Sequence, residues 1–440
     1  MRSIQKAGIS LVAFSLLLAA CGTGDNGKAD TASPASSSTA PAKASAGAGE
    51  KVSLRMTWWG NQKRADLTMQ VIELFERKHP NISIASEFMA QDVYGDKIKT
   101  QIAGRSEPDL IVMGNDYIDY AARNVLVDLD EYVGSEIQID KFQDSFIEPG
   151  RMNGKLYGLN LGNNGVGLIY NKTLFDKAGV SAPGTMTWTQ LEELGKTLVG
   201  KLDKGQYAFA DQSSLNEYFE LFLRQRGKAI NNGGAVGFEA QDVADWLSMW
   251  DRFRKEGIIP KAEISSAHTE LSAETSTLTE GTTAMVFRYL NQLPAFQDAV
   301  KDELGLIKPP SGEDGKTGLW LHPGQYITIS VNSEHPKEAA MFANFMINDP
   351  EATQILGSDR GISISQEARD ALKPTLSPAQ LQMFDYFEKV IASEAPMPKA
   401  MPAGDWNGAL GKAAQKVAFG KSTPEEAGKE VYNAAVKTLK

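Results

Sequence analysis

Hydrophobic and polar residues alternate along residues 52–58, and this period-two pattern predicts a β-strand with one face in a core. Residues 63–79 carry apolar side chains at helical spacing and end before a proline, which predicts an amphipathic helix. A strand at 82–84, a helix at 92–103 and a continuous apolar strand at 110–113 follow. Strands that alternate with helices predict an α/β protein with a mostly parallel sheet and right-handed crossovers.

Polar and aromatic residues stand where two of these strands end. Trp58, Trp59 and Asn61 close the first strand, and Asp116 follows the strand at 110–113. Ligands of open parallel sheets bind beyond the carboxyl ends of the strands. Aromatic planes stack on the C–H faces of sugars, while amides and carboxylates pair with sugar hydroxyls. We therefore expect these four residues to contact a sugar.

Two of these assignments have a structural alternative. The alternation of the first strand places Trp58 on its core-facing side, so Trp59 is favoured as the ligand contact. Asp116 is equally suited to cap a helix that begins at Tyr117.

The N-terminus is typical of an exported protein. Arg2 and Lys6 precede an apolar run at 9–20, which is too short to span a bilayer and predicts a signal peptide over residues 1–20. The run ends Leu-Ala-Ala-Cys, which resembles a bacterial lipobox, and Cys21 is the single cysteine of the chain. We expect Cys21 to be lipidated; the alternative is a stray cysteine behind an ordinary signal peptide.

Residues 22–50 lack aromatic and large aliphatic side chains and predict a disordered tether. A flexible coil of this length spans roughly 30 Å, enough to hold a folded body away from a surface. Together, residues 1–50 indicate a protein that a lipid anchors to the outer face of the membrane and that does not span the bilayer.

Length and charge narrow the possibilities for residues 51–440. A body of this size exceeds one ordinary core, so two lobes are expected. The formal net charge of −10 argues against nucleic acid as a partner.

Several stretches, in this order, resemble the extracellular solute-binding proteins of carbohydrate ABC importers, the maltodextrin-binding-like group. The stretches are 54–59 with the helix that follows, 108–111, 126–129, 154–159, 168–180, 280–285 and 335–347. The Trp-Trp-Gly segment and the Arg-Gly-Ile-Ser segment at 360–363 are similar to members that take up oligosaccharides from pectin.

The resemblance implies two α/β lobes of the periplasmic-binding-protein type, joined by three hinge crossings near 161–165, 322–325 and 360–363. One lobe would comprise 51–162 plus 325–361, and the other 163–324 plus 362–440. It also implies a monomer that binds a carbohydrate, needs no cofactor, and delivers its ligand to two permease subunits served by a cytoplasmic ATPase. Residues 159–165 lack the proline that many members have before the first crossing, so the ligand groups there are the least certain to carry over.

The crossings and the remaining strand ends supply further candidates. Each of these candidates has an amide, guanidinium or indole group and lies in a loop or at a strand end. They are Asn163, Asn164, Arg288, Trp320, Gln325, Arg360 and Trp406. Trp406 alternatively covers a core, and His322 at the second crossing is a weaker candidate. Trp246 and Trp250 lie at helical spacing and predict core positions.

Enzyme signatures are weak. The sequence has no Gly-x-Ser-x-Gly elbow, residues 310–317 begin with proline where a phosphate loop needs glycine, and the four histidines have no metal spacing. We therefore predict a binding protein. The sequence has no twelve-residue calcium loop and we assign no metal ligands, which leaves open a structural calcium ion held by other residues. The alternative is an anchored glycoside hydrolase or lyase that uses paired carboxylates, although no pair can be singled out.

Overall fold

The computed structural model describes residues 51–270, 272–391, 394, 406 and 408–439. The predicted signal peptide, Cys21 and the tether lie outside these residues. Within the described part of the chain, no helix combines the length and the apolar character needed to cross a bilayer.

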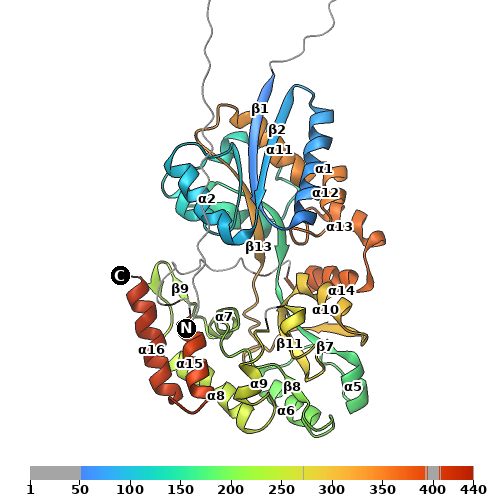
Figure 1. Ribbon diagram of the computed structural model, residues 1–440, viewed down its shortest axis with the longest axis vertical. Helices are drawn as coiled ribbons and strands as arrows, with labels where there is room; N and C mark the ends of the chain where they lie inside the picture. The colour runs from blue at the N-terminus through green and yellow to red at the C-terminus, as the bar shows by residue number, and fades with distance from the viewer. Residues whose placement is uncertain (1–50, 271, 392–393, 395–405, 407, 440) are drawn as a thin grey trace, which may run out of the picture. The chain divides into compact units, whose positions relative to one another are not determined.

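The first lobe is built on a five-stranded sheet with the strand order β2-β1-β3-β13-β6 (Figure 1). Its strands are β1 (Val52–Trp59), β2 (Ile82–Met89), β3 (Leu110–Met113), β6 (Leu159–Asn164) and β13 (His322–Ile329). The predicted β1, β2 and β3 are confirmed and run parallel, whereas β13 pairs antiparallel with both β3 and β6.

Helices cover both faces of this sheet, as the apolar run of β3 predicted. Leu110 and Val112 pack in the core that includes helix α1 (Gln62–Lys78), while Ile111 and Met113 pack against helix α2 (Gln91–Ala103) (Figure 1). The lobe is completed by α3 (Tyr117–Ala121), α4 (Asp144–Ile147), α11 (Pro336–Asn348) and α12 (Pro350–Leu356).

The second lobe is built on a four-stranded sheet, β12-β7-β11-β8. The strands are β7 (Val166–Asn171), β8 (Tyr207–Phe209), β11 (Thr283–Tyr289) and β12 (Leu304–Ile307). Its principal helices are α5 (Lys172–Ala178), α6 (Trp188–Val199), α7 (Asn216–Arg224), α8 (Ala240–Lys255), α10 (Leu293–Ala299), α14 (Pro378–Tyr386), α15 (Ala409–Ala418) and α16 (Pro424–Thr438). Trp246 and Trp250 on α8 are fully buried, which confirms the prediction that they form core.

Three chain segments lie side by side where the sheets are joined. Asn163 and Ile362 exchange two backbone hydrogen bonds of 2.7 Å, and Asn164 pairs with His322. A Cβ on Gly162 would lie 2.7 Å from the Arg360 carbonyl oxygen, so the backbones approach more closely than a side chain would allow. The pairing of β6 and β13 continues a few residues past the predicted lobe boundaries, which themselves remain a prediction.

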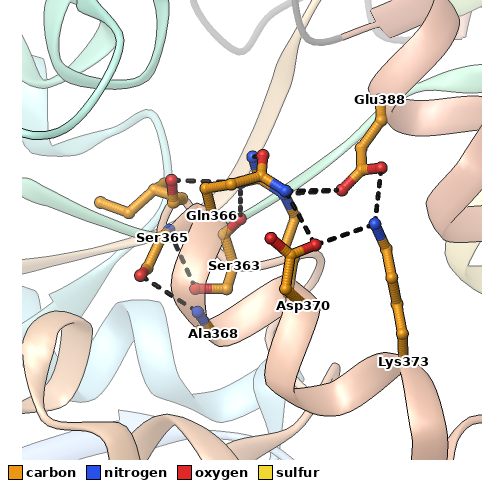
Figure 2. A network of polar contacts seen from close by, with 9 residues as sticks. Ser363, Ser365, Gln366, Ala368, Asp370, Lys373 and Glu388 are labelled. Carbon is orange, nitrogen blue, oxygen red and sulfur yellow. Dashed lines mark hydrogen bonds and ion pairs between the residues drawn. The ribbon is translucent and has the colours of Figure 1, made fainter.

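Behind the third crossing, a polar network ties the chain to helix α13 (Gln366–Leu372) (Figure 2). The buried Arg369 guanidinium donates from Nη1 to the carbonyl oxygens of Ser363 at 2.7 Å and Ile364 at 3.1 Å. Glu388 accepts from Arg369 Nε at 3.3 Å and from Lys373 Nζ at 3.0 Å. These bonds fix the chain where it leaves the crossing.

Candidate functional site

Trp59 and Asp116 flank Gly114 at the carboxyl edge of the first sheet. A Cβ built on Gly114 would lie 3.4 Å from Asp116 Oδ1 and 4.0 Å from Trp59 Cη2. The parallel register of β1 and β3 explains this, because continuing the pairs Met56–Leu110 and Thr57–Ile111 brings Trp59 level with Met113. Glycine therefore leaves a notch between an indole edge and a carboxylate, and we call these three residues the first cluster.

The Trp59 ring is partly exposed and supported from behind. Tyr94 of α2 lies under it, with ring centroids 5.1 Å apart. The Tyr94 hydroxyl donates to the Val112 carbonyl oxygen at 2.7 Å, which holds the supporting ring in place. A ring fixed on one face and accessible elsewhere is suited to stacking on a ligand without much further loss of side-chain entropy.

Asp116 does not cap the helix that begins at Tyr117. Its side chain accepts no capping hydrogen bond, and its backbone is already helical. The residue is exposed, yet the surrounding protein raises the pKa of its carboxyl group by desolvation. The capping alternative is therefore wrong, and the carboxylate is accessible to a ligand.

Tyr289 and His322 form a second cluster at the joint of the two sheets. Their rings stack with centroids 5.0 Å apart and an interplanar angle of 28°. Tyr289 ends β11, and His322 begins β13; both remain partly exposed. Desolvation lowers the pKa of His322 to about 4, so the imidazole is neutral at physiological pH.

Asn164 adjoins the second cluster and stabilises its backbone. Its Oδ1 accepts from the backbone N–H of Gly165 at 3.0 Å and of Asn291 at 3.2 Å. Asn164 pairs with His322 across the ladder and is 8 % exposed. The residue thus positions the loop after β11 and leaves little of its own surface for a ligand.

Strand β13 sets the separation of the two clusters. Tyr326 pairs with Met113, directly before the first cluster, and His322 lies four residues earlier on the same strand. At about 3.3 Å per residue the clusters are at most roughly 13 Å apart along the strand, because the register with β6 shifts between Pro323 and Tyr326. That span exceeds one sugar ring, so a ligand that reached both would have more than one.

Three arginines near these clusters form hydrogen bonds within the protein, although Nε of Arg360 is buried without a partner. Arg64 donates from Nε to Asp359 Oδ2 at 2.6 Å and from Nη2 to the Asp359 carbonyl oxygen at 2.8 Å. The predicted Arg360 is buried and donates to Thr68 Oγ1 at 2.7 Å and to Gln325 Oε1. Burial, reinforced by the neighbouring Arg64, lowers the pKa of Arg360 to about 9.

The predicted Arg288 is the third of these arginines, and it too is buried. It donates from Nε to Gln292 Oε1 at 2.8 Å and from Nη1 to the carbonyl oxygen of Glu270. The next residue, Tyr289, is the one that remains partly exposed at this strand end. All of β11 before Tyr289 is buried, so alternation along the sequence gave no signal to prefer Tyr289 over Arg288.

Other predicted contacts lie inside the protein in this conformation. Trp58 is buried in the core, as the alternation indicated, and the exposed Phe88 stacks on it. Trp320 is fully buried with its neighbours Leu319 and Leu321. Trp406 packs on Phe238 at 5.5 Å, the covering role that was its alternative. The remaining buried candidates are the amides Asn163 and Gln325.

Asn61 remains exposed but has a structural role as well. Its Oδ1 accepts from the Arg64 backbone N–H at 3.0 Å and caps α1. The predictions missed the glycine notch, because the proximity of Gly114 to Trp59 arises only when β1 and β3 pair. Among the described residues, no group of three or more His, Cys, Asp or Glu side chains is arranged to hold a metal ion.

The profile of a protein family described as bacterial extracellular solute-binding protein matches residues 70–378. The melibiose/raffinose/stachyose-binding protein MelE of Bacillus subtilis is 22 % identical over 330 residues, covering 71 % of this chain and 74 % of the relative. A solved structure, an extracellular solute-binding protein family 1 member from Alicyclobacillus acidocaldarius, matches with a TM-score of 0.79 at 27 % identity, covering 89 % of this chain and 99 % of that one.

A periplasmic oligogalacturonide binding protein from Yersinia enterocolitica, in complex with saturated digalacturonic acid, gives a TM-score of 0.71 at 22 % identity. That match covers 88 % of this chain and 99 % of the other, and it shows a common fold. The two sheets, the segments that join them and the family match, which spans more than half of the sequence, lead to one conclusion: this chain belongs to the bacterial extracellular solute-binding proteins, with their two-lobed α/β fold.

Proposed function

We propose that this protein captures an oligosaccharide, of the kind released from plant cell walls, between its two lobes and delivers it to the permease subunits of an ABC importer. The observation that carries the proposal is the notch at Gly114, where an exposed carboxylate and a supported indole edge flank one backbone position. This combination of apolar plane and hydroxyl acceptor matches the two surfaces of a sugar ring. MelE, a relative named for oligosaccharides, supports the same ligand class.

A ligand that touched both clusters would favour closure of the lobes. It stabilises the closed form only by the contacts that it gains there. The first cluster belongs to the first sheet, and Tyr289 belongs to the second, so one bound chain would connect both lobes. The importer subunits could then recognise the closed, ligand-bound conformation.

The primary test is a thermal-shift screen of the mature chain in mild detergent against plant-cell-wall and storage oligosaccharides, with the ligand recovered and weighed. We expect one oligosaccharide class to raise Tm and to be recovered intact. Cleaved sugar would contradict the binding role and favour the glycoside hydrolase or lyase alternative. No shift with any sugar would refute carbohydrate capture.

We also propose that Cys21 carries the lipid that holds the protein on the outer face of the cell membrane, and that the protein acts as a monomer. The lipobox-like Leu-Ala-Ala-Cys sequence and the single cysteine support anchoring. Labelling cells with a palmitate analogue should mark the protein, and Cys21→Ala should release it into the medium or leave its signal uncleaved. Label retained in the Cys21→Ala variant would contradict this assignment.

A further inference from the structure

We propose that the site selects uncharged oligosaccharides and discriminates against chains that carry uronate carboxylates. The inference rests on the proposed function and deepens it by naming the ligand class. It departs from the resemblance to pectin-type members, because pectin oligosaccharides carry uronate carboxylates. It is argued from the charges that the two clusters present to a bound sugar.

The first cluster presents an unpaired negative charge. Asp116 is exposed, lies across Gly114 from the Trp59 ring, and forms no ion pair with any residue that the structure describes. Lys99, whose charge reaches the Asp116 carboxyl group, is itself paired with Asp96 at 3.1 Å. A sugar stacked on Trp59 would therefore have a free carboxylate at its edge.

The second cluster has the same sign. Glu217, on the first turn of α7, is partly exposed and has no ion-pair partner among the described residues. Its neighbour Tyr218 packs on Phe287 of β11 with ring centroids 5.1 Å apart, two residues before Tyr289, so Glu217 lies beside this strand end. Desolvation first, and then the Glu217 charge, raise the pKa of the Tyr289 hydroxyl. His322 is neutral, so the Tyr289–His322 pair adds no compensating positive charge.

The arginines that could reverse this balance are already neutralised or buried. Arg64 is held by Asp359, Arg360 is 5 % exposed and bound to Gln325 and Thr68, and Arg288 is 5 % exposed and bound to Gln292 and Glu270. Recruiting one of them to a ligand carboxylate would break bonds inside the protein. Neutral hydroxyls, in contrast, can donate to Asp116 without any rearrangement.

Repulsion between the Asp116 carboxylate and a ligand carboxylate is therefore what disfavours uronate-containing chains. A ligand carboxylate near Asp116 would meet it in a partly desolvated setting, where charge interactions are stronger than in bulk water. We expect a uronate-containing chain to bind about tenfold more weakly than the same chain without the charge. Because part of the site is open, salt should reduce this difference.

The test uses pairs of probes that differ only in charge. Each neutral hexose-containing oligosaccharide of the screen is compared with its product oxidised at C6 to the uronate, by calorimetry on the mature chain at low and high salt. We expect the neutral member to bind at least about tenfold more tightly at low salt, and Asp116→Asn to reduce the ratio of the two affinities to below about threefold. Glu217→Gln provides a second charge-neutral variant, with a smaller expected reduction.

The outcomes separate this inference from the proposed function. Equal or tighter binding of uronates overturns the inference while carbohydrate capture stands. Discrimination that persists unchanged in both Asp116→Asn and Glu217→Gln also overturns it, because the charge would then not be the cause. Failure of every sugar to bind, charged or neutral, overturns both proposals.

Discussion

The first and second clusters both combine an aromatic ring with polar groups, but they are built differently. The first is assembled at the carboxyl ends of two parallel strands: Trp59 ends β1, while Gly114 and Asp116 follow β3. The partly exposed indole and the exposed carboxylate flank Gly114, which has no side chain. The second is a stacked pair, Tyr289 and His322, whose polar atoms are strongly desolvated by the protein around them. The first cluster is therefore shaped to receive hydroxyls and the second to present a rigid, neutral aromatic surface.

Of the changes that test this difference between the clusters, removal of the Trp59 indole should have the largest effect on sugar affinity. Trp59→Ala deletes the partly exposed stacking plane, and we expect a loss of about 2–3 kcal/mol in sugar binding, roughly 30- to 150-fold in Kd. Trp406→Phe is the matched control, because Trp406 is buried against Phe238; it should lower Tm slightly and leave Kd unchanged. Titration calorimetry measures both, and an unaffected Kd in Trp59→Ala would remove the first cluster from the site.

The second cluster should make the free energy of unfolding depend on pH, through His322. Desolvation sets the folded pKa of His322 at about 4, below the ordinary histidine value of about 6.5, so between these values only the unfolded chain binds the proton. Stability from this group is complete above pH 6.5 and falls as the pH drops towards 4, by roughly 2 kcal/mol after allowance for partial exposure. His322→Phe keeps the stack with Tyr289 and should flatten the change of unfolding free energy over this range. An unchanged pH slope in denaturant titrations would contradict the assignment.

Filling the notch should weaken binding without disturbing the fold. The backbone of Gly114 does not have a positive φ, and a methyl group there meets only ordinary contacts at 3.4 and 4.0 Å. We expect Gly114→Ala to weaken sugar binding about tenfold, near 1.4 kcal/mol, with little change in Tm. Gly95→Ala, in α2 with nothing within 4 Å of the new Cβ, should instead raise stability by about 0.5–1 kcal/mol and leave Kd unaltered. Equal affinities in the two variants would argue against a ligand in the notch.

The smallest effect is expected at the edge of the first cluster. Asn61→Ala removes the cap of α1 and should cost about 1 kcal/mol of stability. Because its Oδ1 is already used by the Arg64 backbone N–H, we expect Kd to change by less than about twofold. Chemical denaturation and calorimetry together distinguish the roles, and a tenfold loss of affinity would return Asn61 to the ligand contacts.

Much of the first lobe was predictable because its signals are local. The alternation of residues 52–58 fixed which tryptophan faces the core, and Trp58 is indeed buried while Trp59 is partly exposed. The helical spacing of Trp246 and Trp250 likewise predicted their burial. In both cases the side chain's direction follows from backbone periodicity, which a short stretch of sequence contains.

The exposure of individual groups at the candidate site was decided by tertiary structure alone. Whether Trp406 is covered depends on Phe238, and whether Arg360 is free depends on Thr68 and Gln325, all distant in sequence. The notch at Gly114 exists only because β1 and β3 pair in one register. The sequence by itself determined the elements, the α/β class and the kind of side chain available at the strand ends. Which of those side chains a ligand can reach was set by long-range packing, because burial depends on partners that no local pattern specifies.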